Sequence, residues 1–263
     1  MGTAILSGLL ASGFPADKVT ITTKSAVSAS KLSDELGVNA ISQENQPTAN
    51  QDAVIGADVV LVAVKPAYVV EVLKEAASKM LENTLVISVA AGITTEAMEA
   101  VLPVTVAVVR SMPNTPAIVG RAVTGISTGS RVSEDQLENA LELFETVGRV
   151  VVLPESQIDA LSTISGSGPA YVFYLIEQLT EAAQNMGFGE DIAAMLVEET
   201  FAGATELLSA SGQSPTELRK QVTSPNGTTM QAVAVMEQAE LSKIFTKATE
   251  AALARAKEIA AGK

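Results

Sequence analysis

Short runs of β-branched and apolar residues alternate with segments of helical spacing over the first 153 residues, and this alternation restricts the fold more than any other feature. The helical spacing is clearest over residues 67–81, where Val69, Leu73 and Ala76 share one face. Nearly continuous apolar runs such as residues 59–64 are typical of strands covered on both faces. The alternation therefore predicts an α/β unit with a doubly wound parallel sheet. Strands are expected at residues 19–22, 58–64, 85–89, 104–109 and 149–153.

The strand pattern disappears after residue 154. Stretches rich in Ala, Leu, Glu and Met are separated by turn sequences at residues 166–169, 187–189, 212–215 and 224–227. The sequence therefore predicts an all-helical domain over residues 154–263, following a first domain over residues 1–153. Small side chains would let its helices approach closely, which favours oligomerisation, although surplus alanine also suits an ordinary helix bundle. These residues are Ala193, Ala194, Ala202, Gly203 and Ala204.

The first residues of the chain, 1–10, read as an apolar helix that Gly13 ends. In a Rossmann-like, dinucleotide-binding unit this helix would follow the first strand and the glycine-rich turn that holds the pyrophosphate, and only Gly2 could belong to that turn. We therefore hypothesise that the first strand is missing and that the sequence begins roughly ten residues late, with a short, remodelled N-terminus as the alternative. Since that strand lies in the middle of such a sheet, its absence would leave unpaired backbone groups on both neighbouring strands.

The composition excludes several kinds of chemistry. The 263 residues include no His and no Cys, which rules out a Ser-His-Asp triad, a Cys nucleophile, a disulfide and a His or Cys metal site. Catalytic groups must come from the remaining polar side chains or from a bound cofactor. The net charge of −13 argues against nucleic acid or an anionic membrane as a partner. Without a membrane-spanning run or a signal-peptide pattern, a soluble protein of the cytoplasm is expected.

Motifs of small residues, prolines and polar residues follow three successive strands of the expected sheet. They are residues 63–66 (Ala-Val-Lys-Pro), 88–92 (Ser-Val-Ala-Ala-Gly) and 110–117 (Arg-Ser-Met-Pro-Asn-Thr-Pro-Ala). The carboxyl ends of parallel strands face the ligand crevice of an open α/β sheet. Lys65 could therefore meet a phosphate or a ribose, although a solvated lysine on a tight turn explains it equally well. Pro66 suits the first position of the next helix.

The end of the expected strand at residues 19–22 bears on the choice of cofactor. Enzymes that select NAD usually place a carboxylate here for the ribose 2′-hydroxyl, whereas hydroxyls and a cation suit the 2′-phosphate of NADP. The chain has Thr23, Lys24 and Ser25 here and no acidic residue before Asp34, which favours NADPH. Thr and Ser are equally good helix N-caps, so these residues also have a purely structural explanation.

Two turn sequences in the helical domain contain more polar residues, glycines and prolines than helix capping requires. Residues 223–229 (Thr-Ser-Pro-Asn-Gly-Thr-Thr) open an apolar helix. Free backbone N–H groups, a flexible glycine and hydroxyls at a helix start can bind an anion without any cation. In residues 166–171 (Gly-Ser-Gly-Pro-Ala-Tyr), Pro169 starts a helix and the glycines leave room for a close neighbour.

With these motifs the chain resembles the pyrroline-5-carboxylate reductase family over essentially its whole length. The most specific matches are residues 110–117, 166–171 and 224–229. The resemblance implies a Rossmann domain that holds NADPH, with NADH possible, and a helical domain that forms an interlocked dimer. Dimers of this family commonly assemble into decamers. The implied reaction is the reduction of 1-pyrroline-5-carboxylate to L-proline, the last step of proline biosynthesis.

The resemblance also implies which residues contact the cofactor. Thr23, Lys24 and Ser25 would lie near the adenosine phosphate. The other implied cofactor positions are Asn50, Ala63, Val64, Lys65, Pro66, Val89, Ala90 and Ala91.

The implied substrate site is the loop at the start of the apolar helix, which would hold the substrate carboxylate and face the partner chain's nicotinamide. Its residues are Ser224, Asn226, Gly227, Thr228 and Thr229. Thr229 matches a hydroxyl that hydrogen-bonds the ring nitrogen, and Glu155 matches an acidic position near the substrate. Asn226 stands where the family usually has Gly, and we expect little harm because Asn tolerates positive φ better than most residues.

The chemistry of the implied reaction agrees with the composition. Reducing a cyclic imine needs a hydride donor, an anchor for the carboxylate and one proton on nitrogen. The imine is readily protonated in water, so no His is required, and a hydroxyl such as that of Thr229 contributes mainly positioning.

Two other interpretations stay open from the sequence. A β-hydroxyacid dehydrogenase would share the architecture but use a catalytic lysine in its helical domain, for which Lys220 is the only nearby candidate. A non-catalytic oligomerising fragment would follow from the missing glycine-rich turn.

Overall fold

The computed structural model describes residues 1–260, which form two compact units. The first unit comprises Met1–Ser167 together with the chain from Ala252 onward, and the second comprises Gly168–Ala251. The predicted boundary at residues 153 and 154 marks where strands stop, whereas the first compact unit extends further. Residues 155–167 belong to it because Ile158 is buried and Leu161 packs over Gly125 of the sheet.

The first unit is built on a five-stranded sheet in the order β3-β4-β5-β6-β7. Its strands are β3 (Val59–Val62), β4 (Leu85–Ser88), β5 (Ala107–Met112), β6 (Ala122–Thr128) and β7 (Gly148–Val152). Strands β3, β4 and β5 pair in parallel, as the sequence predicts, and β6 and β7 are also parallel to each other. The β5–β6 pair is antiparallel.

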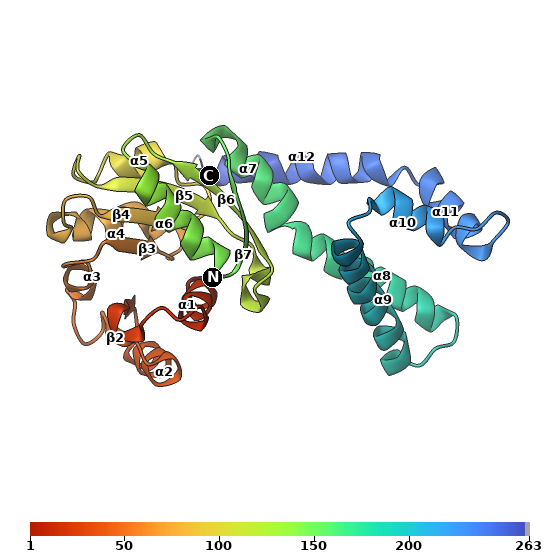
Figure 1. The fold of residues 1–263 in the computed structure, drawn as a ribbon, viewed down its shortest axis with the longest axis horizontal. Coiled ribbons are helices and arrows are strands. Elements are labelled where there is room, and N and C mark those ends of the chain that lie inside the picture. The colour runs from red at the N-terminus through yellow and green to blue at the C-terminus, as the bar shows by residue number, and fades with distance from the viewer. Residues whose placement is uncertain (261–263) are drawn as a thin grey trace. The chain divides into compact units, whose positions relative to one another are not determined.

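Side chains alternate along the central strands into two buried clusters, one for each face of the sheet. Leu85 and Ile87 of β4 belong to one cluster, and Val86 between them belongs to the other. Helices α1 (Gly2–Ala11) and α6 (Glu134–Glu145) supply Ile5 and Phe144 to the first cluster. On the other cluster pack α4 (Val69–Ala76) and α5 (Thr95–Glu99). The sheet is therefore covered on both faces (Figure 1), which explains why its strands read as continuous apolar runs.

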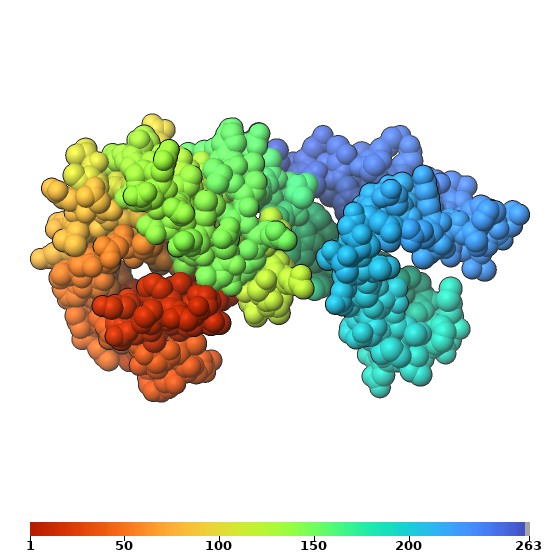
Figure 2. Space-filling view, viewed as in Figure 1, coloured from red at the N-terminus to blue at the C-terminus, as the bar shows by residue number. Residues whose placement is uncertain are grey.

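A separate two-stranded parallel sheet precedes β3 along the chain. It consists of β1 (Thr20–Thr23) and β2 (Asn39–Ser42), joined by α2 (Ala26–Leu36) and followed by α3 (Ala49–Ala53). A dinucleotide-binding sheet has the strand order 3-2-1-4-5-6, so β2 and β1 correspond to its strands 3 and 2, and β3 to its strand 4. No described strand pairs with β1 and β3 at the central position between them. Figure 2 shows an opening there, bordered by α1 in red and by orange segments.

Two strands, β2 and β6, were not predicted from the sequence, and the β5–β6 pair is the one antiparallel pairing in the described part of the predicted parallel sheet. β2 is a short, mixed segment (Asn-Ala-Ile-Ser), and β6 is interrupted by Gly125, so neither shows an apolar run. β6 runs antiparallel because only residues 113–121, with the short helix η4 (Thr115–Val119), separate it from β5. A parallel crossover needs a dozen or more residues.

Short helices account for most remaining differences from the predicted ranges. The helix expected over residues 67–81 divides into η2 (Pro66–Tyr68), α4 and η3 (Ala77–Lys79), with Pro66 at its start as predicted. The turn η1 (Ala16–Lys18) leads into β1, and Gly13 follows α1 with φ +96°. The strand expected at residues 104–109 begins later, at Ala107.

After β7 the chain is helical up to residue 260, as predicted. Helices η5 (Glu155–Gln157), α7 (Ile158–Leu161) and the π-helical η6 (Ser162–Gly166) complete the first unit. The second unit contains α8 (Gly168–Asn185), α9 (Glu190–Ser211), α10 (Pro215–Gln221), α11 (Thr228–Gln238) and most of α12 (Leu241–Ala260). Among residues 1–260, no helix has the length and apolar content that crossing a bilayer requires.

The second unit has almost no core of its own. All of its residues are described, and only Ala193 and Val197 are buried hydrophobic side chains. Large apolar side chains are instead exposed along α8, including Phe173 at 61% and Tyr174 at 59%. A helical unit that buries so little apolar surface is not stabilised by its internal packing alone.

Gly8 offers a test of how α1 packs on the sheet unit. A Cβ at this position would lie 2.3 Å from Cγ1 of the buried Val147 and 3.1 Å from the carbonyl oxygen of Thr146. We expect Gly8→Ala to lower the free energy of unfolding by about 1–3 kcal/mol through overpacking, measured by chemical denaturation. The control is Ser7→Ala at an exposed position of the same helix. If Gly8→Ala were as stable as this control, the close packing of α1 would be refuted.

Candidate functional site

The carboxyl ends of β3, β4 and β5 lie side by side because the strands are parallel and in register. Val62 pairs with Ser88, and Ser88 pairs with Arg110, so the residues after them form one edge of the sheet, here called the rim. Within the predicted cofactor segments at this rim, Ala63, Val64 and Ala91 are exposed, whereas Val62 at the end of β3 and all of β4 are buried. The structure thus brings together the motifs that the sequence placed at strand ends.

The first turn of α1 lies against the end of β3. A Cβ on Gly2 would come within 2.8 Å of Cβ of Ala63, so only glycine permits this approach. The last glycine of a dinucleotide-binding turn has this role, and the pyrophosphate then lies at the helix N-terminus. The small residues present at the rim therefore fit a dinucleotide cofactor, and Gly2 occupies the position expected from the sequence.

The predicted residues after β1 also lie at this edge. Ser25 caps α2 by accepting a hydrogen bond from the backbone N–H of Ser28 (3.3 Å), and the Thr23 hydroxyl donates to the carbonyl of Ser25 (2.9 Å). The Lys24 ammonium lies 6.0 Å from the ring centroid of Tyr68. Because Tyr68 belongs to the turn that contains Lys65 and Pro66, this contact joins the ends of β1 and β3.

Asn50 is held beneath the end of β1 by its side chain. The Thr22 hydroxyl donates to Oδ1 of Asn50 (2.8 Å), and Nδ2 of Asn50 donates to Glu75 (3.4 Å). The predicted cofactor residues therefore come from the ends of β1, β3 and β4 and from α3, all within the first unit.

Glu44 lies beside the end of β1, and the sequence analysis missed it. Its Oε2 accepts a hydrogen bond of 2.8 Å from the backbone N–H of Ala26, the first residue of α2. An acidic residue in this role was expected only in the segment directly after β1. The detectable signal would have been the strand β2, since its parallel pairing with β1 sets residues 43 and 44 beside residues 23 and 24.

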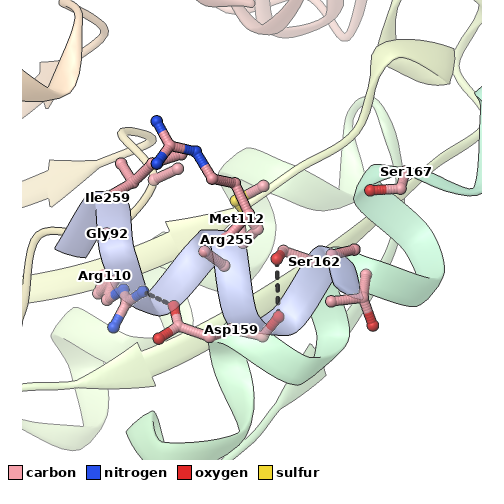
Figure 3. Close-up of a pocket in the computed structure, with 12 residues that line it drawn as sticks. Gly92, Arg110, Met112, Asp159, Ser162, Ser167, Arg255 and Ile259 are labelled. Carbon is pink, nitrogen blue, oxygen red and sulfur yellow. Dashed lines mark hydrogen bonds and ion pairs between the residues drawn. The ribbon is translucent and has the colours of Figure 1, made fainter. Parts of the chain in front are cut away.

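A cavity of about 290 Å³ lies in the first unit beside the ends of β4 and β5 (Figure 3). Asp159 accepts a 2.5 Å hydrogen bond from the guanidinium of Arg110, whose side chain is only 4% exposed. Nε of Arg110 has no hydrogen-bond partner among the described residues. The lining residues are Ala91, Gly92, Arg110, Met112, Asp159, Ser162, Thr163, Ser167, Ala252, Arg255, Ala256 and Ile259.

The cavity has no excess of positive charge. Arg110 is balanced by Asp159 and also by Glu155, whose Oε1 lies 3.4 Å from its Nη1. The other arginine of the lining, Arg255, pairs with Glu258 at 2.7 Å. Both arginines of the lining are therefore paired with carboxylates.

Glu155 has a structural position in this chain. Its two carboxylate oxygens accept hydrogen bonds from the backbone N–H (2.8 Å) and the hydroxyl (2.7 Å) of Thr95 at the start of α5. The same carboxylate pairs with Arg110, and it is not among the residues that line the cavity. A role in substrate binding, which the resemblance implied, stays a prediction.

Asn114 joins the proline-bracketed loop after β5 to two other segments. Its side-chain amide donates to the carbonyl of Ser165 in η6 (2.9 Å) and accepts from the backbone N–H of Val123 in β6 (2.9 Å). The motif at residues 110–117 therefore fixes η6 against the sheet.

The predicted substrate loop lies in the second unit. Asn226 has φ +60°, in the left-handed region that Asn tolerates better than most residues, and the expectation that it does little harm stays a prediction. Gly227 is the N-cap of α11, and a Cβ there would lie 2.5 Å from Oγ of Ser224. No side chain caps the first turn of α11, which leaves its N–H groups available to an anion. The residues of this turn and of the start of α11 are together called the cradle: Ser224, Asn226, Gly227, Thr228 and Thr229.

Lys220, the residue that a β-hydroxyacid dehydrogenase would require, lies exposed in the last turn of α10. No metal-binding cluster occurs among the described acidic side chains.

A parallel sheet with a dinucleotide rim, followed by a helical unit, defines a two-domain oxidoreductase of the nicotinamide-dependent class. Residues 155–259 match the family model for pyrroline-5-carboxylate reductase dimerisation, and residues 1–92 match a model described as NADP oxidoreductase, coenzyme F420-dependent. A pyrroline-5-carboxylate reductase from Corynebacterium melassecola is 37% identical over 98% of this chain and 95% of its own length. The chain belongs to the pyrroline-5-carboxylate reductase family.

Solved structures of the family agree with the fold described above. A pyrroline-5-carboxylate reductase from Coxiella burnetii matches with a TM-score of 0.91 and 37% identity, covering 98% of this chain and 94% of its own. The enzyme from Plasmodium falciparum, solved with NADP bound, matches with a TM-score of 0.83 and 25% identity, covering 99% of this chain and 94% of its own.

The role of Glu155 is testable by Glu155→Gln. Because this carboxylate joins Thr95 to a buried arginine, we expect the variant to lower the free energy of unfolding by about 1–3 kcal/mol. A structural role predicts an unchanged KM for the substrate at temperatures where the variant is folded. The control is Glu96→Gln, an exposed glutamate next to Thr95 in α5. A raised KM with unchanged thermal stability would instead make Glu155 a substrate-binding residue.

Proposed function

We propose that this chain reduces 1-pyrroline-5-carboxylate to L-proline with NAD(P)H. The observation that carries the proposal is the presence, in one chain, of a dinucleotide rim and of an uncapped helix start that is free to bind a carboxylate. The family relationship supports the same reaction.

The separate roles of the cofactor and the protein in this reaction follow from the chemistry of the substrate. The cofactor supplies a hydride to the carbon of the C=N bond, and the nitrogen of the ring carries one proton. Since a cyclic imine is readily protonated in water, the protein needs no strong acid. Its residues bind, orient and shield the substrate, which is consistent with a chain that contains no His or Cys.

The cradle is proposed to hold the substrate carboxylate through backbone N–H groups. The helix dipole adds only about 0.3–1 kcal/mol at an exposed site and up to about 2 kcal/mol when partly buried, so several donors must act together. The charge balance of the cavity supports this assignment, because its arginines are paired with carboxylates. Within the cradle, Thr229 is proposed to orient the ring by hydrogen-bonding its nitrogen.

The cofactor is proposed to lie along the rim, with its adenosine end at Thr23, Lys24 and Ser25. Asn50 and the segments 63–66 and 89–91 would contact the rest of the cofactor. The cradle of one chain is proposed to serve the rim of its partner chain, so that each site needs two copies.

The protein is proposed to form a dimer through the second unit, with further assembly of dimers into a decamer. The near absence of a core between Gly168 and Ala251, with large apolar side chains exposed on α8, supports association through these helices. The matching dimerisation model over residues 155–259 supports it as well. We propose the cytoplasm as the location, since the reaction consumes reduced nicotinamide cofactor that metabolism supplies there.

Thr229 is tested by replacing its hydroxyl. We expect Thr229→Ala to lower kcat by about 10- to 100-fold, because a positioned hydroxyl that assists proton transfer contributes an effect of this order. Thr229→Ser should recover most of the activity, measured as cofactor oxidation in the presence of 1-pyrroline-5-carboxylate. The control is Thr246→Ala, an exposed threonine whose hydroxyl bonds only within α12. Unchanged kinetics in Thr229→Ala would remove this residue from the mechanism.

Association is tested at Phe173, which is 61% exposed in the single chain. A carboxylate in an apolar interface is strongly unfavourable, so Phe173→Asp should shift the protein toward monomer in light scattering and reduce activity together with the oligomer. The control is Gln178→Asp, which adds the same charge to an exposed position of the same helix. If Phe173→Asp kept the wild-type mass, this face of α8 would not be an interface.

A further inference from the structure

In this chain, a positive and a negative side chain both lie where the ribose 2′ substituent of the cofactor would bind. The residues after β1 present the ammonium of Lys24 and the hydroxyls of Thr23 and Ser25. Glu44 adds a carboxylate from the neighbouring strand, although the sequence alone showed only the features that favour a phosphate. The balance between the ammonium, the hydroxyls and the carboxylate determines how tightly a 2′-phosphate binds.

The carboxylate of Glu44 is fixed close to these residues by the main chain. The backbone N–H of Gln43 donates to the carbonyl of Thr23 (2.8 Å), and that of Glu44 donates to the carbonyl of Lys24 (3.2 Å). The parallel pairing of β1 and β2 is thus continued past the ends of both strands. Glu44 therefore stays at this edge even when its side chain changes rotamer.

The carboxylate of Glu44 accepts a hydrogen bond from a backbone N–H group that a bound phosphate would use. In the first turn of α2, Glu44 accepts from the N–H of Ala26 at 2.8 Å, and the hydroxyl of Ser25 accepts from the N–H of Ser28 at 3.3 Å. A 2′-phosphate placed here must displace Glu44 from Ala26 and then remain close to its negative charge. A ribose 2′-hydroxyl has the opposite preference, because it can donate a hydrogen bond to the carboxylate.

We propose that Glu44 is a cofactor-specificity residue that favours NADH and restrains the preference for NADPH set by Lys24. This inference rests on the proposed function, since it concerns the adenosine end of the same cofactor site. It makes this chain an enzyme that uses both cofactors, with the ratio between them controlled by one carboxylate.

The test uses Glu44→Gln in the full chain, because a glutamine oxygen still accepts from Ala26 while the negative charge is removed. Two probes, AMP and adenosine 2′,5′-bisphosphate, differ only in the 2′-phosphate, and their dissociation constants are measured by calorimetry. We expect the variant to bind the bisphosphate about tenfold more tightly, as removal of one nearby like charge predicts, and to bind AMP no more tightly than wild type. In steady-state kinetics, the ratio of kcat/KM for NADPH to that for NADH should rise by a similar factor.

The matched control is Glu35→Gln, which removes the same charge from the far end of α2, about 14 Å along the helix. It should leave both affinities unchanged. If Glu44→Gln and wild type bind each probe equally well, or if both affinities move in the same direction, the specificity role of Glu44 is overturned and the proposed function is unaffected. If wild type binds neither probe nor either cofactor, the cofactor site itself is refuted, and the proposed function fails with it.

Discussion

Parallel pairing of β3, β4 and β5 is the constraint on which the rest of the first unit depends. It aligns Val62, Ser88 and Arg110 across the sheet, so that three segments distant in sequence end at one edge. The two faces of these strands are filled by separate apolar clusters, which leaves the carboxyl edge as the place where small exposed residues meet. A cofactor crevice is therefore a consequence of strand direction combined with burial on both faces.

Beside that edge, a buried arginine forms ion pairs with two carboxylates. Arg110 is the last charged residue of β5 and joins Asp159 and Glu155 of the segment after β7 to the sheet. Because its charge is neutralised within the fold, it contributes to architecture and does not attract an anion. The second unit, which has almost no core of its own, instead offers uncapped backbone N–H donors at the start of α11.

The parts that sequence reasoning predicted correctly are those governed by local pattern. The apolar strands β3 and β4 and the helix start at Pro66 all depend on residues close together along the chain. The missed elements have weak local signals: β2 is short and partly polar, and β6 contains Gly125 within its run. The antiparallel direction of β6 could have been inferred from its short connection to β5, since no crossover fits there.

The amino-acid sequence by itself determined the α/β organisation of the first part of the chain and the helical organisation of the second, the absence of His and Cys chemistry, and the motifs that carry the family relationship. These properties follow from periodicity, composition and the conformational preferences of single residues. Only the tertiary structure decided that Glu44 lies beside Lys24 and that Glu155 is engaged by Thr95 and Arg110. Such contacts arise between strands and helices that are far apart in sequence, and strand pairing and burial, which no local pattern encodes, bring them together.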